Sequence, residues 1–308
     1  MDFSAIVCTY NRAGNLESCL GHLAAQENAA GIQWEAVVVD NNSSDDTRAV
    51  VDDLARRLPI TIRYEFEPEQ GLNHARNHGV RATAGRYFAF VDDDISVSRG
   101  WLRGLLDCLQ KNDADAAGSC IHLHDDVRLP AWITPDMYGF LGYQDFGPAP
   151  FQMDGFEKYP FGGNMSFNRR VVERVGLFDT NLGRKGEGRK RRELFKGAET
   201  DYFHRLAAAG ARIFYTPDAV VHHKVLPFQL TKKYFRTLHF NSGYQRGVHE
   251  QQGSGRSLFG IPLFLYPQLA RSVLRYARKT LAEGPDAAFR LQMNAGYHLG
   301  LMLGHRRA

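Results

Sequence analysis

Short apolar runs alternate with segments of helical period along the first 120 residues of the chain. The apolar runs predict strands over residues 5–8, 35–39, 60–65, 87–91 and 114–119. Between them, apolar residues recur three and four positions apart, which predicts helices over residues 14–26, 46–57, 72–83 and 101–110. This repetition predicts an α/β fold in which a mostly parallel sheet is covered by helices on both faces.

The pattern changes after residue 120. Residues 122–160 are rich in proline, glycine and aromatic residues, which predicts a long loop or a small subdomain. Strands are predicted over residues 161–167, 212–215 and 219–221, and helices over residues 198–209 and from residue 231 onward. The pattern therefore predicts an α/β domain over residues 1–225 and a helical C-terminal extension over residues 226–308.

Polar clusters follow three of the predicted strands at the point where each strand ends. They are Thr9-Tyr10-Asn11-Arg12, Asp40-Asn41-Asn42-Ser43 and Asp92-Asp93-Asp94. In sheets of this kind, ligands bind outside the carboxyl ends of the strands. The three clusters converge on one rim of the predicted sheet, where we expect a binding site.

Asp92, Asp93 and Asp94 form the strongest chemical signal, and we call them the acidic cluster. Three adjacent carboxylates repel one another, and a bound cation reduces that cost. Oxygen ligands favour Mg²⁺ or Mn²⁺, and a hard ion with few protein ligands usually shares a phosphate. A solvated acidic turn, or an N-cap run before Ser96, is the alternative.

Two further segments favour contacts with a nucleotide or another anion. Asp40 is not needed to cap the next helix, so its carboxylate is free to accept hydrogen bonds from a base or a ribose. Gly71 precedes a predicted helix that carries Asn73 and Arg76. The first turn of such a helix presents backbone N–H groups and a guanidinium to an anion. An ordinary surface helix is the alternative for this segment.

These segments resemble those of the family 2 glycosyltransferases of the GT-A fold, over about residues 3–223. The resemblance implies a nucleotide-binding half over about residues 1–120 and an acceptor half over about 121–225. Residues 9–12 resemble the family's nucleotide loop, and Asp40 matches its base-contacting aspartate. The nucleotide-binding set implied in this way is Thr9, Tyr10, Asn11, Arg12, Asp40, Asn42, Asn73, Arg76, Asp92 and Asp93.

The acidic cluster matches the D-x-D motif of that family. The resemblance implies that Asp94 holds the metal and that Asp92 or Asp93 faces the ribose and the diphosphate. Gly162-Gly163-Asn164 resembles the segment that lines the donor sugar and the acceptor. Trp132 is placed with these sugar- and acceptor-binding residues, although an aromatic side chain serves packing equally well.

Two later motifs extend the resemblance. Residues 197–206, GAETDYFHRL, are similar to the start of the family's catalytic helix, usually written G-E-D-x-D/E-L. The register places Glu199 at the general base and Asp201 beside it as a second catalytic acid, with Ala198 where an acid is usual. Residues 217–223 resemble a terminal V-V-x-H, which places His223 at the metal-binding histidine. The alternative for Glu199 is a carboxylate in the first turn of a helix, favoured by the helix dipole. The alternative for His223 is a histidine that packs in the core.

The resemblance implies an inverting glycosyltransferase, of transferase class EC 2.4, that moves a sugar from a nucleoside diphosphate sugar to an acceptor hydroxyl. It implies a UDP-sugar donor and Mg²⁺ or Mn²⁺ as the cofactor. The implied acceptor is a glycan, a lipid-linked or a small molecule in polysaccharide, glycolipid or other cell-envelope synthesis. The residues agree, because displacing a nucleoside diphosphate needs a cation at the leaving group and a base at the acceptor hydroxyl. A non-catalytic nucleotide-sugar-binding or scaffold protein of the same fold is the alternative.

Composition narrows the partners and the compartment. The 308 residues include 38 Lys and Arg and 34 Asp and Glu, and a net charge of +4 is too small to argue for nucleic acid as a partner. The four cysteines lack C-x-x-C spacing, so we expect neither a disulfide framework nor a structural zinc, and a reducing cytosol fits. We find no leader segment and no apolar run of ~18 residues, which favours a cytoplasmic protein. The first strand is not followed by G-x-G-x-x-G, which argues against a dehydrogenase.

Two regions leave alternatives open. The basic stretch 184–192 is a solvated loop, a lid over a diphosphate, or a contact with an anionic acceptor at the inner face of the membrane. In the tail, Gly296, Gly300 and Gly304 favour close helix packing. Residues 258–266, with the arginines that follow them, predict an interfacial membrane contact, whereas the alternatives are that the same aromatic residues cover the core or form a dimer face. The oligomeric state stays open.

Overall fold

The structure, a computed structural model, describes residues 1–186, 193–194, 197–249 and 256–306. The chain divides into two compact units. The α/β unit comprises Met1–Val127, Leu141–Glu187 and Ala198–Val225, and the helical unit comprises Arg128–Phe140, Gly188–Gly197 and Leu226–Ala308. Residues 128–140, which precede Leu141 in the chain, belong to the helical unit.

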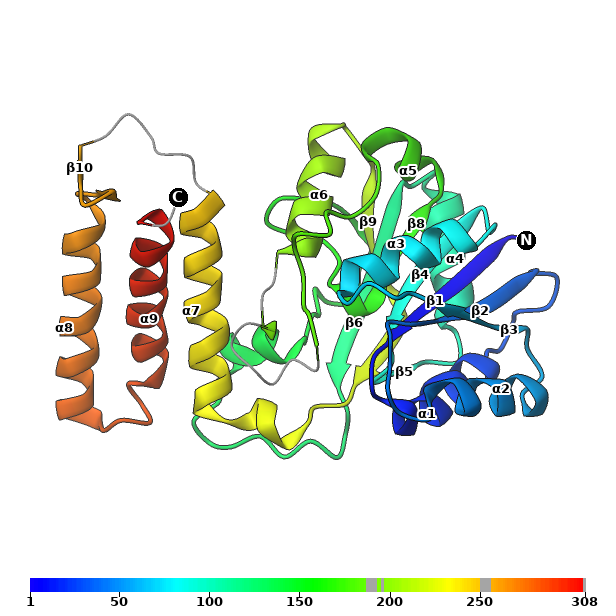
Figure 1. The fold of residues 1–308 in the computed structure, drawn as a ribbon, viewed down its shortest axis with the longest axis horizontal. Helices are drawn as coiled ribbons and strands as arrows, with labels where there is room; N and C mark the ends of the chain where they lie inside the picture. The colour runs from blue at the N-terminus through cyan, green and yellow to red at the C-terminus, as the bar shows by residue number, and fades with distance from the viewer. Residues whose placement is uncertain (187–192, 195–196, 250–255, 307–308) are drawn as a thin grey trace. The chain divides into compact units, whose positions relative to one another are not determined.

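A nine-stranded sheet forms the centre of the described α/β unit (Figure 1). Its path runs β3-β2-β1-β4-β8-β6-β9-β5, and β7 pairs with β9. Strands β1, β2, β3 and β4 are parallel, as are β6 and β9, whereas β8 runs antiparallel between β4 and β6. The strands are β1 (Phe3–Thr9), β2 (Trp34–Asp40), β3 (Ile62–Phe66), β4 (Tyr87–Asp92), β5 (Ile95–Val97), β6 (Ala116–Leu123), β7 (Phe151–Met153), β8 (Met165–Asn168) and β9 (Ile213–His223).

Helices bury both faces of the sheet, so the predicted α/β class is confirmed. Successive strand residues point to opposite faces, and accordingly Ile6 joins one core while Val7 joins the other. Trp101 is fully buried in the core that contains Val7, and Phe203 is fully buried in the core that contains Ile6. The helices are α1 (Ala13–Ala24), α2 (Thr47–Arg57) and α4 (Trp101–Lys111) on the Val7 side, and α3 (Leu72–Ala82), α5 (Arg170–Val175) and α6 (Ala198–Ala208) on the Ile6 side.

Two predicted strands differ in the structure. The strands expected at 212–215 and 219–221 form one strand, β9, which continues through Pro217. The β6–β9 register shifts between Ser119 and Ile121, and the Ser119 hydroxyl accepts a hydrogen bond from the Ala219 N–H at this irregularity. The strand expected at 161–167 begins only at Met165, because Gly162–Asn164 form a 3₁₀ turn, η2.

In the helical unit, α9 (Phe289–His305) contacts both α7 (Lys232–His249) and α8 (Leu265–Glu283) (Figure 1). The backbones of α7 and α9 approach closely at glycines on both helices. A Cβ atom added to Gly300 would collide with the Phe240 carbonyl, and one on Gly247 would lie 2.9 Å from the His305 nitrogen. The predicted close packing is confirmed at Gly300 and Gly304, whereas Gly296 faces open space. None of the helices within the described ranges is both long and apolar enough to cross a bilayer.

Candidate active site

The acidic cluster lies where β4 ends and the short strand β5 begins. Asp93 is 4% exposed and accepts hydrogen bonds from the Thr9 hydroxyl at 2.7 Å and from Arg12 Nη1 at 2.9 Å. Arg12 Nη1 also lies 2.9 Å from Asp94 Oδ2, so one guanidinium joins two of the three carboxylates. Burial raises the pKa of Asp93 to about 6 against the opposing charge of Arg12. Arg12 thus offsets part of the repulsion among the three carboxylates, which, from the sequence, we expect a bound cation to reduce.

Antiparallel pairing of β5 with β9 places His223 opposite Ile95, and therefore beside Asp94. His223 Nε2 lies 3.5 Å from Asp94 Oδ1, an atom that is buried and has no hydrogen-bond partner among the described residues. His223 Nδ1 lies 2.7 Å from the Leu141 carbonyl oxygen, which can only accept. Nδ1 therefore carries the hydrogen in a neutral ring, and Nε2 presents its lone pair toward Asp94.

This pair fits the divalent ion that the sequence predicts. A free carboxylate oxygen and an imidazole lone pair are both ligands for Mg²⁺ or Mn²⁺, and the bond to the Leu141 carbonyl orients the ring. Burial raises the pKa of Asp94, but the opposing effects of His223, Arg12 and Arg184 together are larger. The net pKa is therefore lowered, and the carboxylate is held in its charged form. Burial lowers the pKa of His223, but the charge of Asp94 and its close contact with the ring, the charge of Asp92 and the hydrogen bond to the Leu141 carbonyl together raise it by more.

Arg76 and Glu199 form the second half of the site. Arg76 lies on α3 and is 1% exposed, and Glu199 lies in the first turn of α6. Arg76 Nη2 donates a hydrogen bond to Glu199 Oε1 at 2.9 Å. Burial raises the pKa of Glu199, but Arg76, a backbone hydrogen bond and the charge of Arg184 together lower it by more, so the carboxylate is ionised. The family resemblance places Arg76 among the nucleotide-binding residues. In the structure its guanidinium contacts Glu199, the expected general base.

Gly162 and Gly163 lie between these two halves. A Cβ atom on Gly162 would collide with Glu199 Oε1 and would lie 2.6 Å from Arg76 Nη2. A Cβ atom on Gly163 would lie 3.3 Å from Asp92 Oδ2. The 3₁₀ turn therefore brings backbone without side chains against the expected base on one side and against the acidic cluster on the other.

Several of the residues predicted to bind a nucleotide lie where β1 and β2 end. Asn11 and Asn42 both have positive φ, 51° and 67°, which turns the two loops sharply. Asn11 Oδ1 accepts a hydrogen bond from the Ser44 N–H at 2.7 Å, which ties the loops together. Asp40, expected to be free, already accepts bonds from the Ser43 N–H and the Tyr64 hydroxyl, both at 2.8 Å. Its remaining lone pairs are what is left for a base.

Several predicted residues are held by the protein itself. Asn164 is fully buried, accepts from Trp101 Nε1, and donates to the Cys120 and Ala219 carbonyls. Asn73 is 1% exposed and donates to the Asp179 and Leu182 carbonyls. Asp201 accepts a hydrogen bond from Arg205, one turn further along α6. Trp132 packs edge-on against Phe235 and Phe289 within the helical unit. Tyr10 is partly exposed. The exposed Asn42 donates to the Pro68 carbonyl.

Arg184 is a residue of the site that sequence reasoning places only within a basic stretch. Its carbonyl accepts from the Leu72 N–H at 3.0 Å, at the start of α3. Its charge acts to lower the pKa values of Asp92, Asp94 and Glu199. The density of basic residues in 184–192 was the available signal, and residues 187–192 lie outside the described part of the chain.

The chain is similar to known proteins over most of its length. Residues 4–176 match the family model described as Glycosyl transferase family 2. The succinoglycan biosynthesis protein ExoM of Rhizobium meliloti is 28% identical over 78% of this chain and 72% of its own length. A glucosyl-dolichyl phosphate glucuronosyltransferase of Haloferax volcanii is 25% identical over 98% of this chain and 97% of its own length.

Solved structures share the fold. The mannosyltransferase PcManGT from Pyrobaculum calidifontis, in complex with GDP-Man and Mn²⁺, superposes with a TM-score of 0.63 at 20% identity, over 97% of this chain and 85% of that one. TarS 1–349 from S. aureus, in complex with UDP-GlcNAc, gives a TM-score of 0.57 at 13% identity, over 98% of this chain and 90% of that one. The chain adopts the GT-A fold and belongs to the family 2 glycosyltransferases.

Proposed function

We propose that this glycosyltransferase moves a sugar from a nucleoside diphosphate sugar to an acceptor hydroxyl with inversion, in the synthesis of a cell-envelope glycan. The observation that carries the proposal is the glycine turn that contacts Asp92 of the acidic cluster on one side and the Arg76–Glu199 pair on the other, together with the placement of His223 beside Asp94. The Asp94–His223 pair suits a divalent ion at the leaving group, and the Arg76–Glu199 pair supplies an ionised base.

The chemistry follows from these positions. When bound, Mg²⁺ or Mn²⁺ supplies positive charge to the departing diphosphate, with Asp94 and His223 as its ligands. The acceptor oxygen attacks the anomeric carbon, the bond from that carbon to the phosphate oxygen breaks with its electron pair, and the acceptor proton passes to Glu199. Arg76 holds the Glu199 carboxylate in place and ionised before the proton arrives. A single in-line displacement of this kind inverts the anomeric centre.

The donor and the pathway are supported by the relatives. TarS is described with UDP-GlcNAc, PcManGT with GDP-Man and Mn²⁺, and ExoM as a succinoglycan biosynthesis protein. We propose a UDP-sugar, because UDP is the usual nucleotide of the family and Asp40 is compatible with its base. The acceptor would be a glycan or a lipid-linked molecule at the cytoplasmic face of the membrane.

The test is thermal unfolding with a panel of nucleoside diphosphates and nucleotide sugars, each with and without Mn²⁺. A ligand at 100 times its Kd stabilises the folded state by about 2.7 kcal/mol, which raises the melting temperature by several degrees. We expect one nucleotide to give a shift that Mn²⁺ enlarges. Shifts that are absent, or equal without the metal, would contradict the proposed donor and metal site.

The Glu199→Gln variant separates catalysis from binding. We expect it to keep the nucleotide-dependent shift and to lose ~10²-fold or more in turnover, as for loss of a general base. Unchanged turnover would remove Glu199 from its role. A wild-type protein that binds the nucleotide but shows no turnover with any acceptor would favour the alternative, a non-catalytic nucleotide-sugar-binding member of the family.

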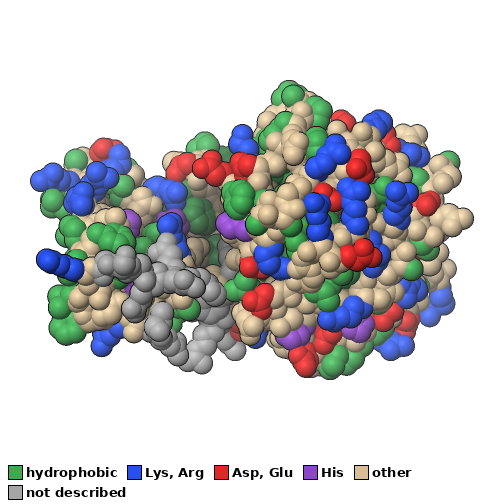
Figure 2. Space-filling view, turned by 90° about the horizontal axis from the view of Figure 1, so that it is seen from above, with side chains coloured by type: hydrophobic (Ala, Val, Ile, Leu, Met, Phe, Trp, Pro, Cys, Tyr) green, Lys and Arg blue, Asp and Glu red, His purple; other side chains and the backbone are tan. Residues whose placement is uncertain are grey.

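The exposed face of α8 supports a contact with an anionic membrane surface. Val273, Leu274 and Leu281 are 48%, 49% and 90% exposed, and Arg271, Arg275 and Arg278 are exposed beside them. At ~100° per residue, the apolar and the basic side chains form two adjacent stripes along the helix. In the space-filling view, basic and hydrophobic side chains lie next to one another on the helical unit (Figure 2). We propose that this face lies on an anionic bilayer, apolar stripe inward.

Vesicle flotation tests the membrane contact with the full chain. We expect binding to vesicles that contain phosphatidylglycerol and weak binding to phosphatidylcholine alone. At about 1 kcal/mol per arginine, replacing Arg271, Arg275 and Arg278 with glutamine weakens binding roughly 100-fold. The matched control replaces three exposed arginines of α2, Arg48, Arg56 and Arg57, and keeps binding. Equal losses in the two triple variants would exclude the α8 face.

A further inference from the structure

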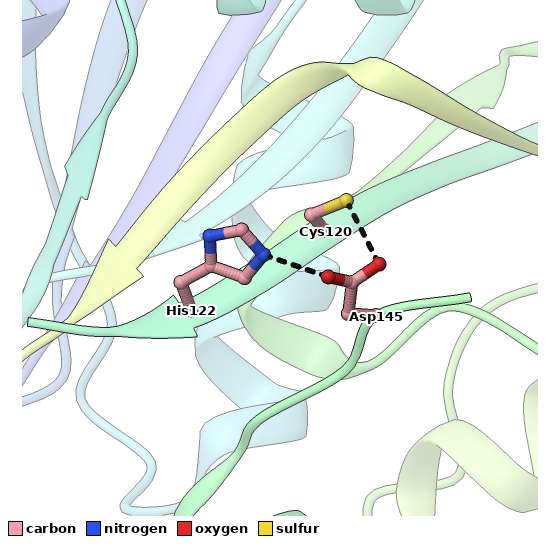
Figure 3. Close-up of side chains that lie close together, drawn as sticks. All are labelled: Cys120, His122 and Asp145. Atoms are coloured by element: carbon pink, nitrogen blue, oxygen red, sulfur yellow. Dashed lines mark hydrogen bonds and ion pairs between the residues drawn. The ribbon is translucent and has the colours of Figure 1, made fainter. Parts of the chain in front are cut away.

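A second group of potential metal ligands lies in the α/β unit (Figure 3). Cys120 and His122 are two positions apart on β6, so their side chains point to the same face of the sheet. Asp145 reaches them from the loop that follows Leu141. His122 Nε2 lies 3.1 Å from Asp145 Oδ2, and Cys120 Sγ lies 3.7 Å from Asp145 Oδ1. The three ligand atoms lie within 4.8 Å of one another.

Two of these separations are close to those around one tetrahedral ion. With a metal–sulfur bond of ~2.3 Å and a metal–nitrogen bond of ~2.0 Å, two tetrahedral ligands lie about 3.3 to 3.6 Å apart. The observed 3.1 and 3.7 Å involve the two oxygens of Asp145, so binding one ion requires rotation of the side chains to bring all three ligand atoms, now within 4.8 Å of one another, to these separations. The Cys120 side chain is buried, whereas Asp145 and His122 are 28% and 37% exposed, which leaves a fourth position open to solvent.

Tyr215 completes the surroundings of the sulfur atom. Its hydroxyl lies 2.8 Å from Cys120 Sγ and 3.3 Å from Asp145 Oδ1. A hydroxyl at this distance can donate to a thiolate and thereby orient and stabilise a sulfur ligand from outside the coordination shell. In the metal-free protein the same contact serves as an ordinary hydrogen bond between a thiol and a phenol.

We propose that Cys120, His122 and Asp145 bind a divalent ion of zinc type, at a site separate from Asp94 and His223. The combination of sulfur, imidazole and carboxylate ligands selects Zn²⁺ over Mg²⁺ or Mn²⁺, which prefer oxygen. On binding, the metal–sulfur bond forms and the thiol proton leaves to solvent. The spacing of the cysteines alone does not predict this site, because its third ligand comes from a distant loop.

The ion would stiffen the loop that orients His223. This loop is fixed to β6 at Gln144, whose backbone pairs with Ile121, and at Asp145, while its Leu141 carbonyl binds His223 Nδ1. Holding Asp145 to β6 therefore restrains the carbonyl that sets the tautomer of His223. This consequence rests on the proposed function of His223, whereas the zinc-type site itself does not.

Cobalt substitution tests the site in the full-length protein. We strip metals with a chelator and titrate Co²⁺, because a thiolate bound to cobalt absorbs in the near ultraviolet and carboxylate or imidazole ligands do not. We expect one equivalent to produce this band and Zn²⁺ to abolish it. The Cys120→Ser variant should lose the band, and the matched Cys108→Ser variant, a buried cysteine on α4, should keep it.

Asp145→Asn provides a second variant at a partly exposed position, in case Cys120→Ser does not fold. We expect it to keep the fold and weaken Zn²⁺ binding ten- to a hundred-fold, roughly the loss expected on disturbing a metal site. No band in the wild-type protein, or a band that Cys120→Ser retains, would overturn the proposal and leave a hydrogen-bonded cluster only. The nucleotide-dependent shift is measured separately, so failure of the zinc site and failure of the proposed function are distinguishable.

Discussion

The Gly162→Ala substitution tests whether the Arg76–Glu199 pair must keep its geometry. Gly162 does not have a positive φ, so alanine can adopt its backbone conformation and the effect is steric. The added Cβ atom would lie 2.6 Å from Arg76 Nη2 and 3.1 Å from Glu199 Cδ. Reaching an ordinary contact of 3.4 Å displaces the guanidinium by about 0.8 Å. Because Arg76 is buried, the exposed end of Glu199 has to move as well.

A misplacement of about 1 Å at a reacting group costs roughly 10²-fold in rate. We therefore expect kcat to fall by about that factor, while binding of the nucleoside diphosphate changes less than about threefold. Overpacking costs about 1 to 3 kcal/mol, so the melting temperature falls by a few degrees. Turnover is followed as release of nucleoside diphosphate from the donor that stabilises the wild-type protein.

Gly21→Ala is the matched control, because a Cβ atom on this glycine of α1 meets nothing within 4 Å. We expect it to be neutral or stabilising by up to about 1 kcal/mol, with wild-type kcat. Wild-type turnover in Gly162→Ala would refute the reasoning, since the pair would then tolerate displacement. Loss of nucleotide binding in parallel with turnover would also refute it, by placing the effect outside the pair.

The remaining predictions concern the metal site, the helix packing and a carboxylate in the turn before α2. Asp94→Asn should remove the Mn²⁺-dependent part of the nucleotide shift, and a shift that still doubles with Mn²⁺ would exclude Asp94 as a ligand. Gly300→Ala should destabilise the helical unit by at least about 1 to 3 kcal/mol in denaturant unfolding, whereas Gly296→Ala should not; equal effects would contradict the close approach of α7 and α9. Burial raises the pKa of Asp45, but hydrogen bonds from Thr47 and from the backbone N–H of Ala13, among others, together lower it by more. The stability that Asp45 contributes is present above pH ~4 and is lost as the pH falls, so the difference in melting temperature between the wild type and Asp45→Asn should shrink below pH 4 and not grow.

The sequence pattern predicts the first half of the sheet well. Strands β1, β2 and β4 are buried on both faces and read as continuous apolar runs, and polar clusters mark their carboxyl ends. The pattern of side chains does not reveal which strand is the neighbour or in which direction it runs. The antiparallel β8 between β4 and β6 was therefore not predictable from its apolar residues.

The sequence identifies candidate site residues by their type, but it does not reveal which of them contact one another. Asp94, His223 and Glu199 were identified from motifs, and the structure brings Asp94 to His223 through β5–β9 pairing. The Arg76–Glu199 pair joins residues 123 positions apart, and no periodicity encodes such a contact. Asn164 was expected at the sugar, yet polarity alone does not distinguish a ligand from a buried amide that bridges strands.

The position of β8 between β4 and β6 has a consequence for how the chain is made. β8 begins 73 positions after β4 ends, so at 5–20 residues per second a ribosome finishes β4 about 4 to 15 s before its neighbour exists. During that interval one edge of an apolar, fully formed strand has no partner, and such edges invite pairing with other chains. The nascent protein should therefore need shielding by a chaperone at this stage, and a mutation that slows translation between residues 92 and 165 should lower the soluble yield without altering the finished molecule.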